Sequence, residues 1–243
     1  MDKYSILKQY YGHSAFRAGQ EALIDAILSG RDALCVMPTG GGKSLCYQIP
    51  ALLLPSITLV VSPLISLMKD QVAALKSAGV PAAYINSSLT GEQIRTVYAR
   101  TRKGAYKLIY VAPERLETNS FLSLMQEMDV SFLAVDEAHC ISQWGQDFRP
   151  SYLGIVDFIN ALPHRPIVAA YTATATKQVQ SDILRLLQLQ SPYRIVTGFD
   201  RPNLYFDVRR PKNKFSALAA LIDERRGRSG IVYCATRAAV VRV

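Results

Sequence analysis

A glycine-rich stretch at residues 37–44, Met-Pro-Thr-Gly-Gly-Gly-Lys-Ser, constrains this chain more than any other part of its sequence. Successive glycines let the backbone turn sharply and point its N–H groups inward, and a helix that starts near Gly42 adds its positive N-terminal end. The pattern G-x-x-x-x-G-K-[ST] binds phosphates in this way, although Met37 stands in place of its first glycine. The stretch therefore predicts a phosphate-binding loop, and a glycine-rich turn beside a surface lysine is the alternative. The residues expected around the phosphates are Thr39, Gly40, Gly41, Gly42, Lys43 and Ser44.

Strand and helix patterns alternate along the chain after this loop. Strands are predicted at 57–62, 81–86, 107–111, 132–136, 167–171 and 194–197, and helices at 64–77, 91–101, 121–128, 151–162 and 178–189. A further helix at 20–28 precedes the glycines. Such alternation indicates an α/β fold with a mostly parallel central sheet and helices on both faces. Ligands are then expected at the carboxyl ends of the strands.

Composition narrows the classes of protein. A chain of 243 residues can bury one substantial core. It has neither an apolar run long enough for a membrane span nor a hydrophobic N-terminal signal, which predicts a cytoplasmic protein. Its four cysteines are scattered, which favours reduced thiols over a zinc site or a disulfide framework. The formal charge of +9, with eight basic and three acidic residues between 201 and 228, favours a polyanionic partner.

Two adjacent carboxylates, Asp136 and Glu137, end the apolar strand predicted at 132–136. In a nucleotide hydrolase Asp136 would hold the Mg²⁺ shell together with Ser44, and Glu137 would position and deprotonate the attacking water. Lys43 would reach the β- and γ-phosphates. An Asp-Glu pair after a strand is otherwise the solvated start of a helix, but the glycine-rich loop upstream favours the catalytic interpretation.

Three further motifs allow two interpretations each. Trp144, Phe148 and Arg149 lie in a loop rich in Gly and Pro, where they could stack on unpaired bases, or the two aromatic rings could fill the core beneath the loop. The run at 171–176 alternates threonine with alanine, so it could relay hydrogen bonds or simply cap a helix. Arg17 and Gln20 could meet a nucleotide base, or they could be a surface arginine and a helix cap.

Together these motifs resemble superfamily 2 helicases, and the resemblance to the RecQ family of DNA helicases is close. The run 136–150 is the most specific, because many helicases carry Asp-Glu-Ala-His but this family continues it with an aromatic-rich loop. The resembling segments are 16–20, 37–48, 60–72, 110–116, 135–152, 171–176, 197–204 and 229–234.

The resemblance implies a RecA-like fold, ATP and Mg²⁺ as cofactors, single-stranded or partially duplex DNA as partner, and unwinding in the 3′ to 5′ direction. It assigns Gln20 to adenine recognition and Arg17 to packing on the base. The family usually has an aromatic ring at the position of His13 and often a proline at that of Ala18. The residues implied to contact DNA are Ser62, Pro63, Pro113, Arg115, Trp144, Phe148 and Arg149, and those implied to couple the two sites are His139, Thr172 and Thr174.

The resemblance also implies a domain organisation. Residues 1–202 would form the first RecA-like lobe and residues 203–243 an incomplete second lobe, with a helix at 214–226 and a strand at 230–234. The second lobe supplies the arginine finger in this family, so the chain by itself is expected to bind ATP but to hydrolyse it slowly, as a monomer and without zinc. A small-molecule phosphotransferase and a non-catalytic nucleic-acid-binding module with a vestigial phosphate loop are the alternatives.

Overall fold

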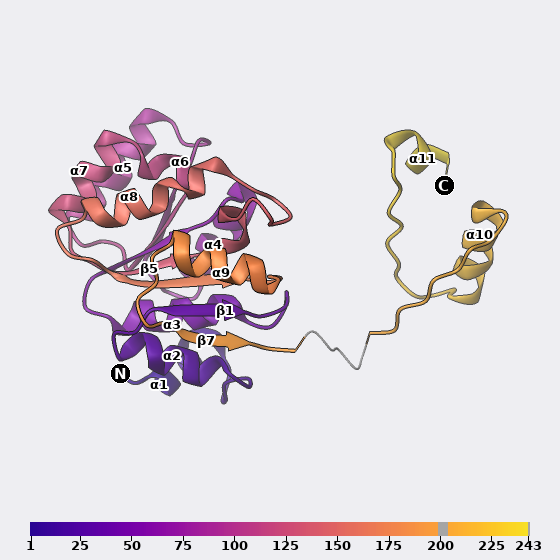
Figure 1. Ribbon diagram of the computed structural model, residues 1–243, viewed down its shortest axis with the longest axis horizontal. Helices are drawn as coiled ribbons and strands as arrows, with labels where there is room; N and C mark the ends of the chain where they lie inside the picture. The colour runs from indigo at the N-terminus through magenta and orange to yellow at the C-terminus, as the bar shows by residue number, and fades with distance from the viewer. Residues whose placement is uncertain (199–203, 243) are drawn as a thin grey trace. The chain divides into compact units, whose positions relative to one another are not determined.

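The computed structural model describes residues 1–198 and 204–242, and the chain divides into two compact units, 1–199 and 200–243 (Figure 1). The predicted boundary between residues 202 and 203, like most of the resembling segment 197–204, lies outside the described residues. The division into a first lobe and the start of a second therefore stays a prediction. No helix in the described part of the chain is long and apolar enough to cross a membrane.

The first unit is built on a sheet of seven parallel strands in the order β3-β4-β2-β5-β6-β1-β7. This confirms the predicted α/β class, and each predicted strand lies within two residues of its observed bounds. The strands are β1 Ala33–Val36, β2 Ile57–Val61, β3 Ala82–Ile85, β4 Leu108–Val111, β5 Val130–Val135, β6 Ile167–Thr172 and β7 Tyr193–Val196.

Helices cover both faces of the sheet, as the long apolar strands require. Successive side chains of β1 point to opposite faces, so Leu34 and Val36 join one core cluster while Ala33 and Cys35 join the other. Helices α5, α7, α8 and α9 cover the first face, and α2, α3 and α4 cover the second (Figure 1). The helices of this unit are α1 Lys3–Tyr11, α2 Gln20–Leu28, α3 Lys43–Leu53, α4 Ile65–Ser77, α5 Gly91–Arg102, α6 Pro113–Leu116, α7 Asn119–Glu127, α8 Gly154–Ala161 and α9 Lys177–Leu186, with 3-10 turns η1 Ala138–Ile141 and η2 Pro150–Tyr152.

Helix boundaries follow local capping. Thr90 and Gln93 form a reciprocal capping box at the start of α5, and the Thr176 hydroxyl accepts the N–H of Val179 at the start of α9. The threonine run therefore does contain an N-cap, which was one of its two interpretations. Helix α1 was not predicted, because it is polar over most of its length and buries only Ile6 and Leu7 among its nine residues.

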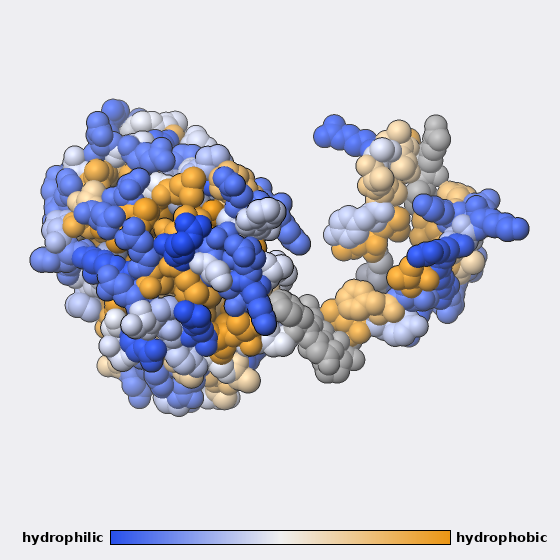
Figure 2. All heavy atoms as spheres, viewed as in Figure 1, coloured by the Kyte–Doolittle hydropathy of each residue, from blue (hydrophilic) through white to orange (hydrophobic). Residues whose placement is uncertain are grey.

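The second unit contains α10 Lys214–Glu224 and α11 Arg237–Arg242 among its described residues. The helix predicted at 214–226 is confirmed in outline, but the predicted strand at 230–234 is wrong. A strand needs a neighbour for its backbone hydrogen bonds, and residues 204–242 contain no other strand to supply one. Helix α10 buries none of its side chains, and apolar residues such as Phe206, Val208 and Ile231 are exposed in this unit. Figure 2 shows hydrophobic spheres on its surface.

Candidate active site

The glycine-rich loop connects the carboxyl end of β1 to the first turn of α3. Gly42 occupies the N-cap with φ of 86°, and a Cβ at this position would overlap the side-chain amide of Gln20, so only glycine fits. No side chain caps α3, which leaves the N–H groups of its first turn for another acceptor. The predicted loop-to-helix geometry of a phosphate site is therefore present.

Three side chains hold the carbonyl groups of this loop. The Arg17 guanidinium donates to the Gly40 carbonyl over 2.6 Å, the Gln20 amide donates to the carbonyls of Gly41 and Gly42 over 3.3 Å, and Lys43 Nζ donates to the Met37 carbonyl over 3.0 Å. The Gln20 side chain is buried, and its Oε1 accepts the backbone N–H of Arg17 over 2.8 Å. With its carbonyls occupied in this way, the loop offers an anion mainly N–H groups and the Lys43 ammonium.

The two predicted catalytic carboxylates follow β5. Asp136 is 7% exposed, and its pKa is raised to about 6 by burial and by the neighbouring Glu137 carboxylate. At neutral pH most of this carboxyl is still ionised, and a bound cation would favour the ionised form further. Glu137 has φ of 47°, a left-handed conformation that is uncommon outside glycine and asparagine, while its N–H donates to Asp136 Oδ1 over 3.0 Å. Such backbone strain is typical of functional sites.

Strand β6 lies between β1 and β5 and connects the two halves of the site through its last residue, Thr172. The Thr172 carbonyl accepts the N–H of Met37, and the Thr172 hydroxyl donates to the Thr174 carbonyl over 3.0 Å. Because that hydroxyl has a single proton, His139 Nδ1 must carry the hydrogen in its 2.9 Å bond to Thr172 Oγ1. The same nitrogen lies 3.3 Å from Glu137 Oε2. The structure thus brings the three predicted coupling residues into one network with Glu137, one of the two predicted catalytic carboxylates.

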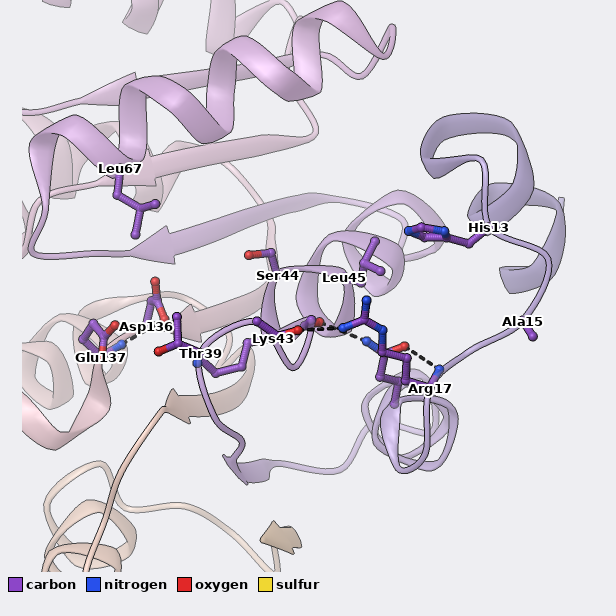
Figure 3. Close-up of a pocket in the computed structure, with 13 residues that line it drawn as sticks. His13, Ala15, Arg17, Thr39, Lys43, Ser44, Leu45, Leu67, Asp136 and Glu137 are labelled. Carbon is purple, nitrogen blue, oxygen red and sulfur yellow. Dashed lines mark hydrogen bonds between the residues drawn. The ribbon is translucent and has the colours of Figure 1, made fainter. Parts of the chain in front are cut away.

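The glycine-rich loop and the two carboxylates line a cavity of about 440 Å³. His13 and Arg17 lie at one end, Asp136 and Glu137 at the other, and Lys43 between them (Figure 3). All the predicted nucleotide-binding and catalytic residues line this cavity except Gly41, whereas none of the three predicted coupling residues does. Ala15, Leu45 and Leu67 also line it and were not predicted, since apolar side chains carry no signature of a nucleotide site.

The aromatic-rich loop, residues 142–149, connects η1 to η2. Trp144 is 75% exposed, so the alternative in which it fills the core is wrong, while Phe148 is half-buried. Gly145 is required by close approach, because a Cβ there would overlap the carbonyl of His139. Arg149 forms an ion pair with Asp147 over 2.7 Å and donates to the Pro63 carbonyl over 3.2 Å. The loop is therefore joined to the segment that follows β2.

Three of the predicted DNA-contacting residues, Pro63, Arg115 and Arg149, line a second cavity of about 410 Å³. Two others are placed differently. Ser62 is 2% exposed and Pro113 is buried, so these side chains lie beneath the surface and only their segments border the cavity. Ser87, Glu114 and Thr118 also line it, and none of them was predicted to contact DNA, although Glu114 lies in the resembling segment 110–116.

The four cysteines are free thiols. Cys35, Cys46 and Cys140 are buried and Cys234 is half-buried. Burial raises the pKa of Cys35 and that of Cys140 to about 12, so these thiols stay protonated at neutral pH. The described residues contain no cluster of His, Cys, Asp and Glu side chains suited to a metal ion.

Comparison with known proteins agrees with this geometry. The family model described as DEAD/DEAH box helicase matches residues 17–182. Proteins named ATP-dependent DNA helicase RecQ from Bacillus subtilis and from Pasteurella multocida are each 48% identical over 98% of the chain, which spans 41% and 38% of their lengths. The predicted resemblance to the RecQ family is thereby confirmed.

A crystal structure of the DUF1998 helicase MrfA matches 99% of the chain, and 39% of its own length, with a TM-score of 0.73 and 16% identity. At that identity the match supports the fold alone, and it agrees with the parallel sheet and its two helical layers. The family model covers more than half of the chain, and the protein accordingly belongs to the DEAD/DEAH box helicase family.

Proposed function

We propose that this chain is the ATP-binding motor lobe of a RecQ-like DNA helicase, which binds Mg²⁺-ATP and single-stranded DNA and couples hydrolysis to unwinding in the 3′ to 5′ direction. The observation that carries the proposal is the convergence of the phosphate loop, both carboxylates and the Arg17–Gln20 pair on one cavity. Because the chain spans about two fifths of the length of its curated relatives, unwinding belongs to the longer protein in this proposal.

The donor set suits ATP and Mg²⁺. Ser44 and Asp136 would hold the cation, whose charge would neutralise the phosphates and polarise the bond that breaks. Lys43 and the first turn of α3 would bind the β- and γ-phosphate oxygens, and Arg17 and Gln20 are at the end of the cavity suited to the base. Glu137, opposite them, would orient a water for in-line attack and accept its proton.

Contact with DNA would be made by the second cavity and the aromatic-rich loop. Arg115 and Arg149 place two guanidinium groups at one surface, where phosphate oxygens could bind, and the exposed Trp144 ring offers a face on which a base could stack. Neither feature reads base edges, so the binding should tolerate any sequence. The cytoplasmic location and the monomeric state remain predictions within this proposal.

We expect the affinity for single-stranded DNA to fall about tenfold or more between 50 and 200 mM salt, because a few phosphate contacts release a corresponding number of counterions. Trp144 is the only tryptophan, so its fluorescence reports binding of an oligothymidine directly. The measurement is a titration at several salt concentrations. An affinity that does not change with salt would contradict phosphate recognition by this surface.

The nucleotide part of the proposal is tested by selectivity. The purified chain should bind a fluorescent ATP analogue, and ATP should displace it at lower concentration than GTP, because the resemblance assigns adenine recognition to Gln20, which would exchange its bonds to the Gly41 and Gly42 carbonyls for the base. Replacement of Gln20 by alanine should remove most of this preference, which we expect to be about tenfold or more for a hydrogen-bonding site. Gln9, an exposed glutamine on α1, gives the control Gln9→Ala. Equal displacement by ATP and GTP in the unmodified chain would refute the assignment.

A further inference from the structure

A buried carboxylate lies outside both cavities and has no role in the chemistry proposed above. Asp182 belongs to α9, is 7% exposed and accepts a hydrogen bond of 2.7 Å from the Ser142 hydroxyl. Its other side-chain partner is Arg185, one helical turn along, at 3.2 Å. A charge this buried is stable only when it is hydrogen-bonded, so the Ser142 hydroxyl is held firmly in place.

Ser142 also bonds to the next residues of the aromatic-rich loop, so fixing its hydroxyl restrains the loop. Its hydroxyl donates its single proton to Asp182 and accepts the backbone N–H of Trp144 over 3.2 Å. Its carbonyl accepts the N–H of Gly145 over 2.9 Å. Ser142 is fully buried, whereas Trp144, two residues later, is 75% exposed. The Asp182–Ser142 bond thus helps to fix the backbone of the loop at Trp144.

Helix α9 is also joined to the nucleotide site. It begins directly after Thr176, in the segment where Thr172 and Thr174 bond to each other, and Thr172 bonds to His139. Two hydrogen bonds therefore connect η1 and the aromatic-rich loop to the segment 172–182. One joins His139 to Thr172 beside Glu137, and the other joins Ser142 to Asp182 at the start of the loop. A movement of the segment 172–182 would act on the loop through both bonds.

We propose that Asp182 is a positioning residue, which acts through Ser142 to hold the aromatic-rich loop in the orientation that receives single-stranded DNA. Through the same bond it connects that loop to the nucleotide site. The consequence for DNA rests on the proposed function, whereas the restraint on Trp144 is a property of the protein alone. These two parts can therefore fail separately.

The test uses the single tryptophan as a probe in the 243-residue chain. Asp182→Ala, which removes the acceptor of the Ser142 hydroxyl, Ser142→Ala and the double variant are compared with Asp157→Ala, which alters an exposed carboxylate on α8. We expect faster local motion of Trp144 in time-resolved anisotropy and stronger acrylamide quenching in the first three proteins only. In these three variants the affinity for oligothymidine should fall about fivefold, which is the effect of losing one hydrogen bond. Their affinity for the ATP analogue should stay within twofold of that of the unmodified chain.

Because both residues act through one bond, the double variant should be no worse than the stronger single variant. Unchanged Trp144 motion in Asp182→Ala, or additive effects in the double variant, would overturn the proposal. If the unmodified chain fails to bind oligothymidine, the proposed DNA function is wrong, yet the anisotropy still decides whether Asp182 restrains the loop. Should Asp182→Ala not fold, Asp182→Asn replaces it, since a neutral amide oxygen accepts the Ser142 hydroxyl less strongly than a carboxylate; Ser142→Ala does not serve here, because it also removes the acceptor of the Trp144 N–H.

Discussion

Replacement of Glu137 by glutamine is expected to lower ATP hydrolysis at least about 100-fold while leaving ATP binding within a few-fold of the unmodified chain. Loss of a positioned general base costs about 10²–10⁴ in rate, and glutamine preserves the size and much of the hydrogen bonding of the side chain. Glu137 lies 3.3 Å from His139 and lines the cavity without contacting Lys43 or the base end. The effect should therefore be confined to the chemical step.

The measurement is phosphate release at saturating Mg²⁺-ATP with and without oligothymidine, with the slow rate expected of this chain followed over long incubations. Glu92→Gln, which changes an exposed carboxylate in the first turn of α5, is the matched control. Hydrolysis by Glu137→Gln at the rate of the control would exclude Glu137 as the base. If the unmodified chain has no measurable hydrolysis, the same pair of variants is compared in the longer protein.

Local signals predicted the strands of the first unit and most of its helices, but not helix α1 and not the order of the strands in space, and they wrongly indicated a strand at 230–234. Alternating apolar runs and helical patterns predict parallel βα units, and the six strands expected between residues 57 and 197 occur there. That β6 separates β1 from β5 depends on packing across the sheet, which no local pattern encodes. The role of Thr172, whose carbonyl meets Met37 and whose hydroxyl meets His139, follows from that order. The sequence could only indicate that a hydrogen-bond relay was one of two interpretations.

The candidate site was predictable to the extent that its chemistry needs particular residue types. Phosphate binding needs glycines and a lysine, and hydrolysis needs carboxylates at a strand end, so Lys43, Asp136 and Glu137 were found. Exposure was not predictable, because Trp144 is as compatible with a core as with a surface, and Ser62 looks exposed by type yet is 2% exposed. Asp182 gave no signal, since a carboxylate in an amphipathic helix is usually solvated.

The phosphate loop and both carboxylates meet at one cavity, and this argues against the two alternative functions, a vestigial phosphate loop and a small-molecule phosphotransferase. A vestigial phosphate loop would be under no constraint to keep Lys43, Asp136 and Glu137 at the same cavity or to keep Glu137 in a strained conformation. A small-molecule phosphotransferase does not account for an exposed tryptophan or for a second cavity lined by Arg115 and Arg149. These features are those expected when nucleotide chemistry and nucleic-acid contact are connected through His139.

Replacement of Lys43 by alanine is expected to weaken the binding of Mg²⁺-ATP by about 10- to 100-fold, because it removes a charge-assisted contact to the phosphates worth about 1.5–3 kcal/mol. The substitution leaves the α3 N-terminus intact but frees the Met37 carbonyl, which Lys43 now occupies at 3.0 Å. Binding is measured by titration with a fluorescent ATP analogue, with Lys69→Ala on the exposed face of α4 as control. An equal thermal midpoint for the two variants would show that the loss is local. If Lys43→Ala binds ATP as tightly as Lys69→Ala, the loop does not bind phosphate through this lysine. If, in addition, neither this variant nor Glu137→Gln changes ATP binding or DNA affinity, the vestigial alternative is correct.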